Sequence, residues 1–273
     1  MSWPALRSRL SDAALALWSL LALFLLLAPV LIVVPMSFSA GKELEFPPRD
    51  FSLHWYVRLF ADPLWIEALR TSLVLAVTSS LLALVAGSLA AYALVRNSVI
   101  WRDGVTASFI GPMVVPPVVL AVAAYLVYAR LGLLGTMPGL VLAHTVLSLP
   151  FVVMIVSNAV AAFDERIEQA AISLGASRAT VLARVVAPAL TPHLLVSWLF
   201  AFAVSFDEVV LTFFIAGIHT TIPKKMFITL RNEIDPTITA VSALLIAVTV
   251  LIGIVAILLL QRRLLAVVGA EKS

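Results

Sequence analysis

The sequence predicts an all-α integral membrane protein with six transmembrane helices, and three observations support this fold class. The 273 residues are 62% hydrophobic and only 12% charged, about half the charged share of a typical soluble domain. The mean hydropathy is +1.10. The apolar residues stand in long blocks, each able to cross the ~30 Å hydrocarbon core of a bilayer as a helix.

Six apolar blocks each supply the roughly 20 residues that a helical crossing needs. A helix satisfies its own backbone hydrogen bonds, which lipid cannot do, and the blocks lack the alternating polarity of barrel strands. The expected spans are residues 13–36, 67–95, 105–129, 139–162, 191–217 and 238–260. These bounds place a transmembrane domain at 13–260, between an N-terminal segment, 1–12, and a C-terminal tail, 261–273.

The first block predicts the orientation of the chain in the membrane. Arg7 and Arg9 precede it, and it is longer than the roughly 7–15 apolar residues of a signal-peptide core. We therefore expect a retained first span with a cytoplasmic N-terminus. Six spans return the C-terminus to the cytoplasm together with the basic residues of 96–102, 163–192 and 261–273, as the positive-inside rule requires. The net charge of +3 fits this bias, and nucleic-acid binding, which needs a dense basic face, is not expected.

The third block contains residues that interrupt a helix. Gly111-Pro112 and Pro116-Pro117 lie within it. Proline removes a backbone donor and disfavours helix in the residue before it, so we expect a kink or an unwound segment. Such a break either lines a cavity, as broken helices in transporters do, or only fits neighbouring helices.

The segment 163–192, between the fourth and fifth spans, is amphipathic and carries charges of both signs. Asp164 is a suitable N-cap for a short helix, Gly175 suits a left-handed stop, and Ser177 is placed to cap a second helix. Four residues recur at helical spacing and are expected to form one apolar face: Ile167, Ala170, Ala171 and Leu174. Small exposed side chains let another protein's backbone come close, so we expect this loop to dock a cytosolic partner.

Paired alanines at 170–171 are followed in fixed register by Gly175 and Pro188. In this order they resemble the loop motif of ABC importer permeases: Glu-Ala-Ala, three residues, Gly, nine residues, then Ile-x-Leu-Pro. Gln169 replaces the glutamate of the motif, although Glu168 stands next to it. Val185 and Ala187 replace its isoleucine and leucine. The resemblance implies an ATPase-coupling role for Glu168, Gln169, Ala170, Ala171, Leu174, Gly175 and Pro188.

Further segments extend the resemblance over nearly the whole chain: Phe51-Ser52-Leu53-x-Trp55-Tyr56, Ala143-His144-Thr145, Leu149-Pro150-Phe151, Leu174-Gly175-Ala176-Ser177 and Ser205-Phe206-Asp207. They are similar to the spermidine/putrescine branch of ABC permeases, and within it to the C-type permeases. This resemblance implies a type I ABC importer permease fold with a cytoplasmic coupling helix, in a bacterial cytoplasmic membrane. It also implies a second permease, an ATPase dimer that binds ATP and Mg, an external solute-binding protein, and a polyamine as the small cationic solute.

Two acidic residues in the fifth span are candidates for the solute pathway. Asp207 and Glu208 lie within an apolar block. A charge at the bilayer centre costs roughly 2.5–3.5 kcal/mol, so such residues normally face a wet cavity or a partner. One hypothesis is that the carboxylates attract an ammonium group of the solute, helped by cation–π contacts from nearby rings. The aromatic candidates are Phe206, Trp198 and Tyr125. The alternative is an ion pair, either with a partner permease or with Arg231 or Lys225.

Several functions are not expected. The sequence has no cysteine, and its four histidines, His54, His144, His193 and His219, lack metal-ligand spacing. We expect no metal site and interpret His144 as bonding within the helical bundle. The sequence contains neither a Gly-x-Ser-x-Gly nucleophile motif nor a phosphate-binding loop, so this chain is expected to be no enzyme and to hold no cofactor.

Two alternatives stay open for the function. The first is the same machine importing another small organic ion, such as an opine, a phosphonate or an amino-acid-like solute. The second is a stand-alone channel or secondary transporter. That second alternative leaves the cytosolic loop motif unexplained.

Overall fold

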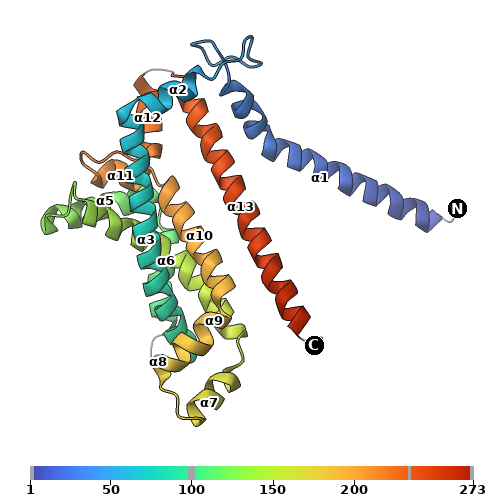
Figure 1. Cartoon of the computed structure of the whole chain (residues 1–273), viewed down its shortest axis with the longest axis vertical. Helices are drawn as coiled ribbons and strands as arrows, with labels where there is room; N and C mark the ends of the chain where they lie inside the picture. Colours follow the sequence, from blue (N-terminus) through green and yellow to red (C-terminus); the bar gives the residue numbers. More distant parts are fainter. Residues whose placement is uncertain (1–2, 98–101, 233–234, 271–273) are drawn as a thin grey trace. The chain divides into compact units, whose positions relative to one another are not determined.

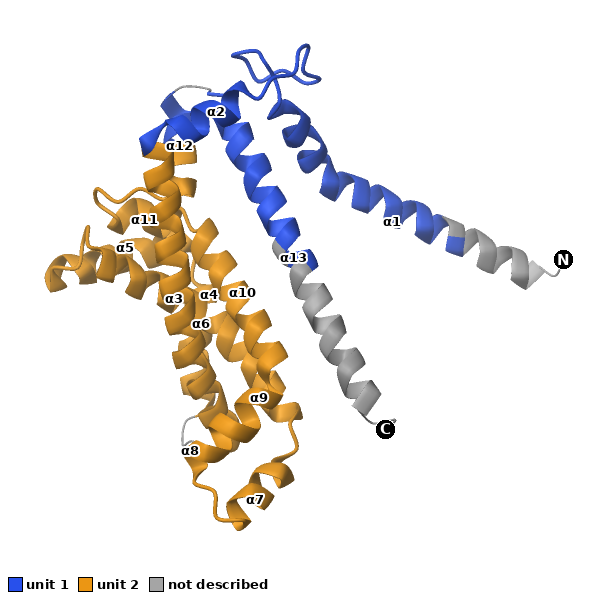
Figure 2. Ribbon diagram, in the orientation of Figure 1, with its two compact units in different colours: residues 1–63, 228–273 blue, residues 64–227 orange. Residues whose placement is uncertain are grey.

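The computed structural model describes residues 3–97, 102–232 and 235–270, and these ranges are predominantly α-helical (Figure 1). The chain separates into two compact units (Figure 2). Unit 1 consists of residues 1–63 and 228–273, and unit 2 of residues 64–227. All predicted ATPase-coupling and solute-pathway residues lie in unit 2.

Unit 1 contains α1 (Trp3–Met36), α2 (His54–Ala61) and α13 (Thr237–Ala270). The short helix α2 begins where the N–H of His54 bonds to the hydroxyl of Ser52 at 3.0 Å, and it buries Trp55. The hydroxyls of Tyr56 and Ser37 lie 2.7 Å apart. This bond ties α2 to the end of α1, and α13 contacts both helices.

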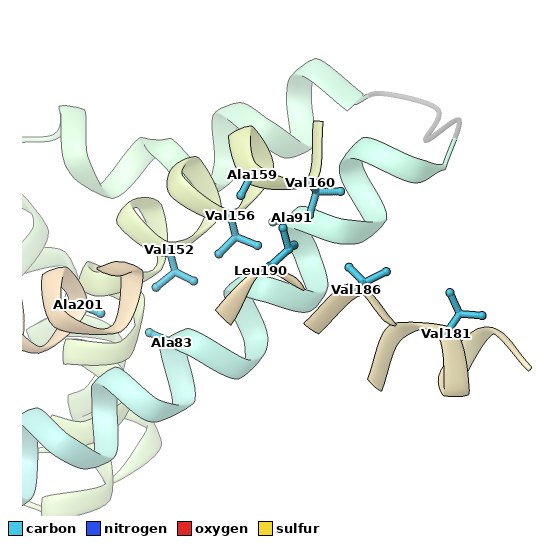
Figure 3. Packing of buried hydrophobic residues seen from close by; sticks show 10 residues of the cluster. All are labelled: Ala83, Ala91, Val152, Val156, Ala159, Val160, Val181, Val186, Leu190 and Ala201. Carbon is cyan, nitrogen blue, oxygen red and sulfur yellow. The ribbon is translucent and has the colours of Figure 1, made fainter. Parts of the chain in front are cut away.

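Unit 2 is organised around α3 (Pro63–Arg96), α6 (Met137–Ala162) and α10 (Thr191–Asp207). A buried apolar cluster joins these helices to the loop helices that precede α10 (Figure 3): Ala83, Ala91, Val152, Val156, Ala159, Val160, Val181, Val186, Leu190 and Ala201. At Gly87 on α3, an added Cβ would lie 2.8 Å from Cγ1 of Val152. Small residues on one face of α3 therefore let it pack tightly against α6.

The third predicted span is broken into two helices. α4 (Arg102–Val114) and α5 (Pro117–Leu131) meet at a bend of 107°. Pro116 and Pro117 have no N–H to continue the helical ladder, and the Pro116 carbonyl instead starts α5 by accepting the N–H of Leu120 at 3.1 Å. The predicted break is confirmed, and two short helices replace the single helix expected over residues 105–129.

The fifth predicted span also differs from the expectation. Instead of one helix over 191–217, α10 ends at Asp207 and a short α11 (Val210–Ile215) follows. The 17 residues of α10 rise about 26 Å, somewhat less than the ~30 Å hydrocarbon core. The loop helices before it are α8 (Arg178–Val181), the π-helical turn η1 (Leu182–Val186) and α9 (Ala187–Ala189), which enter α10 at a bend of 78°. After α11, α12 (Ile222–Asn232) begins in unit 2 and ends in unit 1.

The candidate crossings follow the predicted blocks. Among the described residues, three helical stretches are long and apolar enough to cross a membrane: Ala14–Met36, α3 and α6. Counting each bent pair as one span gives five, and the apolar stretch Thr237–Leu251 of α13 corresponds to the sixth block. The terminal segments 1–12 and 261–273, and their side of the membrane, stay predictions; residues 1–2 and 271–273 lie outside the described ranges.

Candidate functional site

The loop between α6 and α10 contains α7 (Glu165–Ser173). The carboxylate of Asp164 accepts the backbone N–H of Arg166 at 2.9 Å and caps the start of the helix. Gly175, after its end, has a φ of +90°, the left-handed conformation of a helix stop. The hydroxyl of Ser177 accepts the backbone N–H of Thr180 at 3.2 Å and caps α8. The three predicted local signals are therefore confirmed.

One side of α7 presents apolar side chains to the surroundings. Leu174 is 90% exposed and Ile167 is 49% exposed, and Ala170 is exposed between them. We call these three residues the α7 outer face. Ala171, one turn after Ile167, lies at the inner edge of this face and packs, partly buried, against the buried cluster of unit 2. It is only about 40° from Ile167 around the helix, so the four residues share a face as predicted, and Ala171 is the one of them that is partly buried.

Glu168 faces inward and is only 4% exposed. Its Oε1 accepts the Nε–H of Arg96 at 2.8 Å and lies 2.8 Å from Nη2 of the same guanidinium as an ion pair. Its Oε2 accepts the hydroxyl of Tyr92 at 2.6 Å. Nη2 of Arg96 also donates to the carbonyl of Phe163 at 2.8 Å. We call Glu168, Arg96 and Tyr92 the α7 clamp, since they fasten α7 to the end of α3.

The predicted coupling residues therefore divide into two groups. The carboxylate of Glu168 is engaged within this chain and is not presented to the surroundings. Three further predicted coupling residues are exposed: Gln169, Gly175 and Pro188. Nε2 of Gln169 donates to Oε1 of Glu165 at 3.2 Å along the helix surface.

A second candidate region surrounds the break between α10 and α11. Oε1 of Glu208 accepts the N–H of Leu211 at 2.7 Å, and the hydroxyl of Thr212 donates to the Glu208 carbonyl at 3.0 Å. The side chain of Glu208 thus satisfies a free donor at the start of α11, as a capping residue does. This bond occupies one of the two carboxylates that the sequence assigns to the solute pathway.

Buried polar side chains from other helices brace this break. Nδ1 of His144 on α6 lies 2.9 Å from the hydroxyl of Ser205 on α10, and its Nε2 lies 3.1 Å from that of Thr212 on α11. The Ser205 hydroxyl is also 2.8 Å from that of Ser79 on α3. All four side chains are buried. The interpretation of His144 as a residue that bonds within the bundle is confirmed.

Asp207 lies on the opposite side of α10 from this network. Ser205 is buried, whereas Asp207, about 200° further around the helix, is exposed. None of the ion pairs formed by the described residues includes Asp207. Nζ of Lys225, one suggested partner, lies 4.7 Å from the ring centroid of Trp65. Asp207 therefore presents its charge away from the core of its own unit.

Three aromatic rings form a line along α10 that ends at Phe206, the residue before Asp207. The rings of Phe206 and Phe202 are stacked at 5.6 Å, and that of Phe202 lies 6.2 Å from Trp198. Phe202 was not among the sequence candidates, although its four-residue spacing to both neighbours is a signal that it shares their line. Tyr125 lies on α5 and is 44% exposed. No ring contact within the described ranges joins Tyr125 to this line.

Comparison with known proteins decides the family. A family model described as "Binding-protein-dependent transport system inner membrane component" matches residues 83–266, well over half of the chain. The chain belongs to this family. Its members are permease subunits of ABC transporters and are not themselves enzymes. The predicted identification as an ABC permease and the predicted lack of an enzymatic role are therefore confirmed.

Among the relatives of this permease are two bacterial transport proteins. It is 28% identical over 235 residues to the spermidine/putrescine transport system permease protein PotC of Haemophilus influenzae, covering 86% of this chain and 91% of that protein. It is 29% identical over 251 residues to the putrescine transport system permease protein PotI of Escherichia coli, covering 89% of each.

Solved structures confirm the fold of the permease. A bacterial ABC transporter involved in the import of the acidic polysaccharide alginate has a chain that matches with a TM-score of 0.72 at 18% identity, covering 91% of this chain and 96% of that one. The same kind of transporter in complex with an alginate pentasaccharide-bound periplasmic protein matches with a TM-score of 0.66 at 18% identity, covering 90% and 94%. The predicted all-α permease fold class is confirmed by these matches.

The permease has functional candidates that the sequence analysis did not single out. Tyr92 and Arg96 belong to the α7 clamp, and Ser79 belongs to the network at the break between α10 and α11. Their signal in the sequence is a polar side chain inside or at the end of an apolar block, where it needs a partner. Within the described ranges, no group of three or more His, Asp or Glu side chains is arranged to hold a metal ion.

Proposed function

We propose that this permease is part of an importer of putrescine, spermidine or a similar small polycation. It forms the solute pathway together with a second permease, receives the solute from an external binding protein, and is driven by a cytosolic ATPase dimer that docks on α7. Both relatives named above are polyamine permeases by name. The loop 163–192 and both termini then lie on the cytoplasmic side.

The observation that carries the docking role is the α7 outer face. It exposes Ile167 in the first turn and Leu174 at the end of a short capped helix, and leaving such side chains in water forfeits about 1.5–3 kcal/mol each. The small side chain of Ala170 between them allows close approach of a groove on another protein. An ATPase with an apolar groove is the partner that this surface fits.

The chemistry around Asp207 supports a polycation as the solute. An exposed carboxylate in a membrane helix needs a wet cavity or a cation. Phe206 precedes Asp207 in the chain, and the line of rings that it forms with Phe202 and Trp198 on the same helix offers faces that attract ammonium groups and contact methylene chains. A polyamine consists of ammonium groups separated by methylene chains, so it fits this combination. The competing role for Asp207 is an ion pair with the second permease.

Purification and uptake assays test the proposal. The tagged chain is isolated from native membranes with its partners and placed in vesicles with its binding protein and labelled putrescine or spermidine. We expect an ATPase and a second permease to co-purify, and uptake to require both ATP and the binding protein. ATP-dependent uptake that no polyamine competes for would assign another solute. A lone oligomer that moves solute without ATP would overturn the importer assignment.

A further inference from the structure

The α7 clamp connects the proposed docking helix to one particular transmembrane helix. We propose that Tyr92 and Arg96, acting through Glu168, are positioning residues that transmit movement of a docked ATPase from α7 into α3. The proposal rests on the proposed docking of the ATPase at the α7 outer face. It adds which transmembrane helix receives the movement, and through which side chains.

The clamp holds the carboxylate of Glu168 in one orientation. Tyr92 and Arg96 are four residues apart on α3 and therefore face the same side of the helix. They donate to different oxygens, Tyr92 to Oε2 at 2.6 Å and Nε of Arg96 to Oε1 at 2.8 Å. The side chains of Arg96 and Glu168 are only 12% and 6% exposed. Water competes little with such a pair, and its attraction is stronger than at a surface.

Apart from the clamp, few contacts hold α7 in its position. The helix has nine residues and is joined to its neighbours by short turns at Asp164 and Gly175. Ala171 packs against the buried cluster of unit 2, but the single methyl group of alanine makes only a small contact. Glu168 points inward while Leu174 points outward. A pull on the outer face therefore acts directly on the bonds between Glu168 and α3.

α3 carries this movement to the break beside Asp207. It is one helix from Pro63 to Arg96, and its only proline is the first residue. Ser79 lies about 25 Å along the helix from Arg96 at 1.5 Å per residue, and its hydroxyl bonds to that of Ser205 at 2.8 Å. Contiguous bonds through a rigid element are the physical form that coupling between distant sites takes.

The test measures solute taken up per ATP hydrolysed in vesicles that contain the complete importer. The variants are Glu168→Gln, Arg96→Met, Tyr92→Phe and the double change Arg96→Met with Glu168→Gln. We expect the ATPase to remain bound and active, while uptake per ATP falls about fivefold or more in the variants that break the Arg96–Glu168 pair. The double variant should be no worse than the worse single variant, because both changes remove the same interaction.

The matched control is Glu165→Gln, which removes a carboxylate from the exposed side of the same helix. We expect it to leave uptake per ATP unchanged. Unchanged uptake per ATP in the clamp variants would overturn the proposal, and so would an equal loss in the control. Failure of the unaltered chain to retain an ATPase would instead overturn the proposed docking, so the two failures are distinguishable.

A rescue experiment covers the case in which clamp variants assemble poorly. The chain contains no cysteine, so Tyr92→Cys with Glu168→Cys introduces a single thiol pair into it. A reversible thiol cross-linker long enough to replace both side chains should restore uptake per ATP, and reduction should abolish it again. The single Glu168→Cys variant, which breaks the Arg96–Glu168 pair but has no second thiol to link, should show no recovery when treated in the same way. A cross-linked pair that stays uncoupled would overturn the proposal.

Discussion

The hydroxyl of Ser79 lies 2.8 Å from that of Ser205, 126 residues later in the chain. This bond joins α3 to α10 two residues before α10 ends. His144 bonds to the same Ser205 hydroxyl and also to Thr212 on α11. Side chains from α3 and α6 therefore hold α10 and α11 in place on either side of the interruption in the fifth span.

Loss of the Ser205 hydroxyl should destabilise the permease. In Ser205→Ala, Ser79 and His144 each lose a buried hydrogen bond but keep another partner, the carbonyls of Leu75 and of residue 205, so each loss costs about 0.5–1.5 kcal/mol. We expect a lower midpoint of thermal unfolding for the purified complex in detergent. Ser108→Ala is the matched control, because its hydroxyl bonds to the carbonyl of Gly104 at 2.9 Å on an exposed helix surface. Equal midpoints for Ser205→Ala and Ser108→Ala would show that the network contributes nothing.

Signals that lie within a few residues of each other were readable from the sequence. Asp164, Gly175 and Ser177 act on their own neighbours, so their capping roles follow from residue type and spacing alone. The break between α4 and α5 follows from Pro116 and Pro117 for the same reason. The six apolar blocks are also local features of the composition, and the bilayer determines their length.

Features that depend on distant partners were not readable. Glu168 turns inward because Arg96 and Tyr92 are there to receive it, and these residues lie 72 and 76 positions away. The end of α10 carries no proline or glycine, and it depends on the capping bond of Glu208 and on His144, 61 positions before Ser205. A helical pattern shows which residues share a face, but not which neighbouring helix that face meets.

Removal of the Asp207 charge should slow polyamine uptake. A hydrogen bond between a charged carboxylate and an ammonium group contributes about 1.5–3 kcal/mol, so we expect Asp207→Asn to reduce putrescine uptake about tenfold or more. The measurement uses vesicles with the solute-loaded binding protein in excess, so that delivery is not limiting. Asp207→Glu should keep most of the rate. Asp103→Asn, a change at an exposed aspartate on α4, is the control, and normal uptake by Asp207→Asn would remove Asp207 from the pathway.

A charge on the α7 outer face should weaken docking of the ATPase. Leu174 is 90% exposed, and its burial in a groove would contribute about 1.5–3 kcal/mol. In Leu174→Asp we expect the amount of co-purified ATPase to fall about tenfold at limiting concentration, with normal membrane insertion. Ile218→Asp changes an equally exposed apolar residue, 91% exposed, in the loop after α11, and should retain the ATPase. Full retention by Leu174→Asp would locate the docking surface elsewhere.

The turn at Gly175 should be required for coupling rather than for insertion. Its φ of +90° is strained for any residue with a Cβ, although an added Cβ would meet no atom within 4 Å. Gly175→Val therefore acts through backbone conformation, at a cost of about 1–2 kcal/mol, and should shift α7 relative to α8. We expect ATP hydrolysis to continue while uptake per ATP falls. Gly104→Val is the control, since an added Cβ there is equally unobstructed and the position has no positive φ. Normal coupling in Gly175→Val would mean that the turn does not set the position of the docking helix.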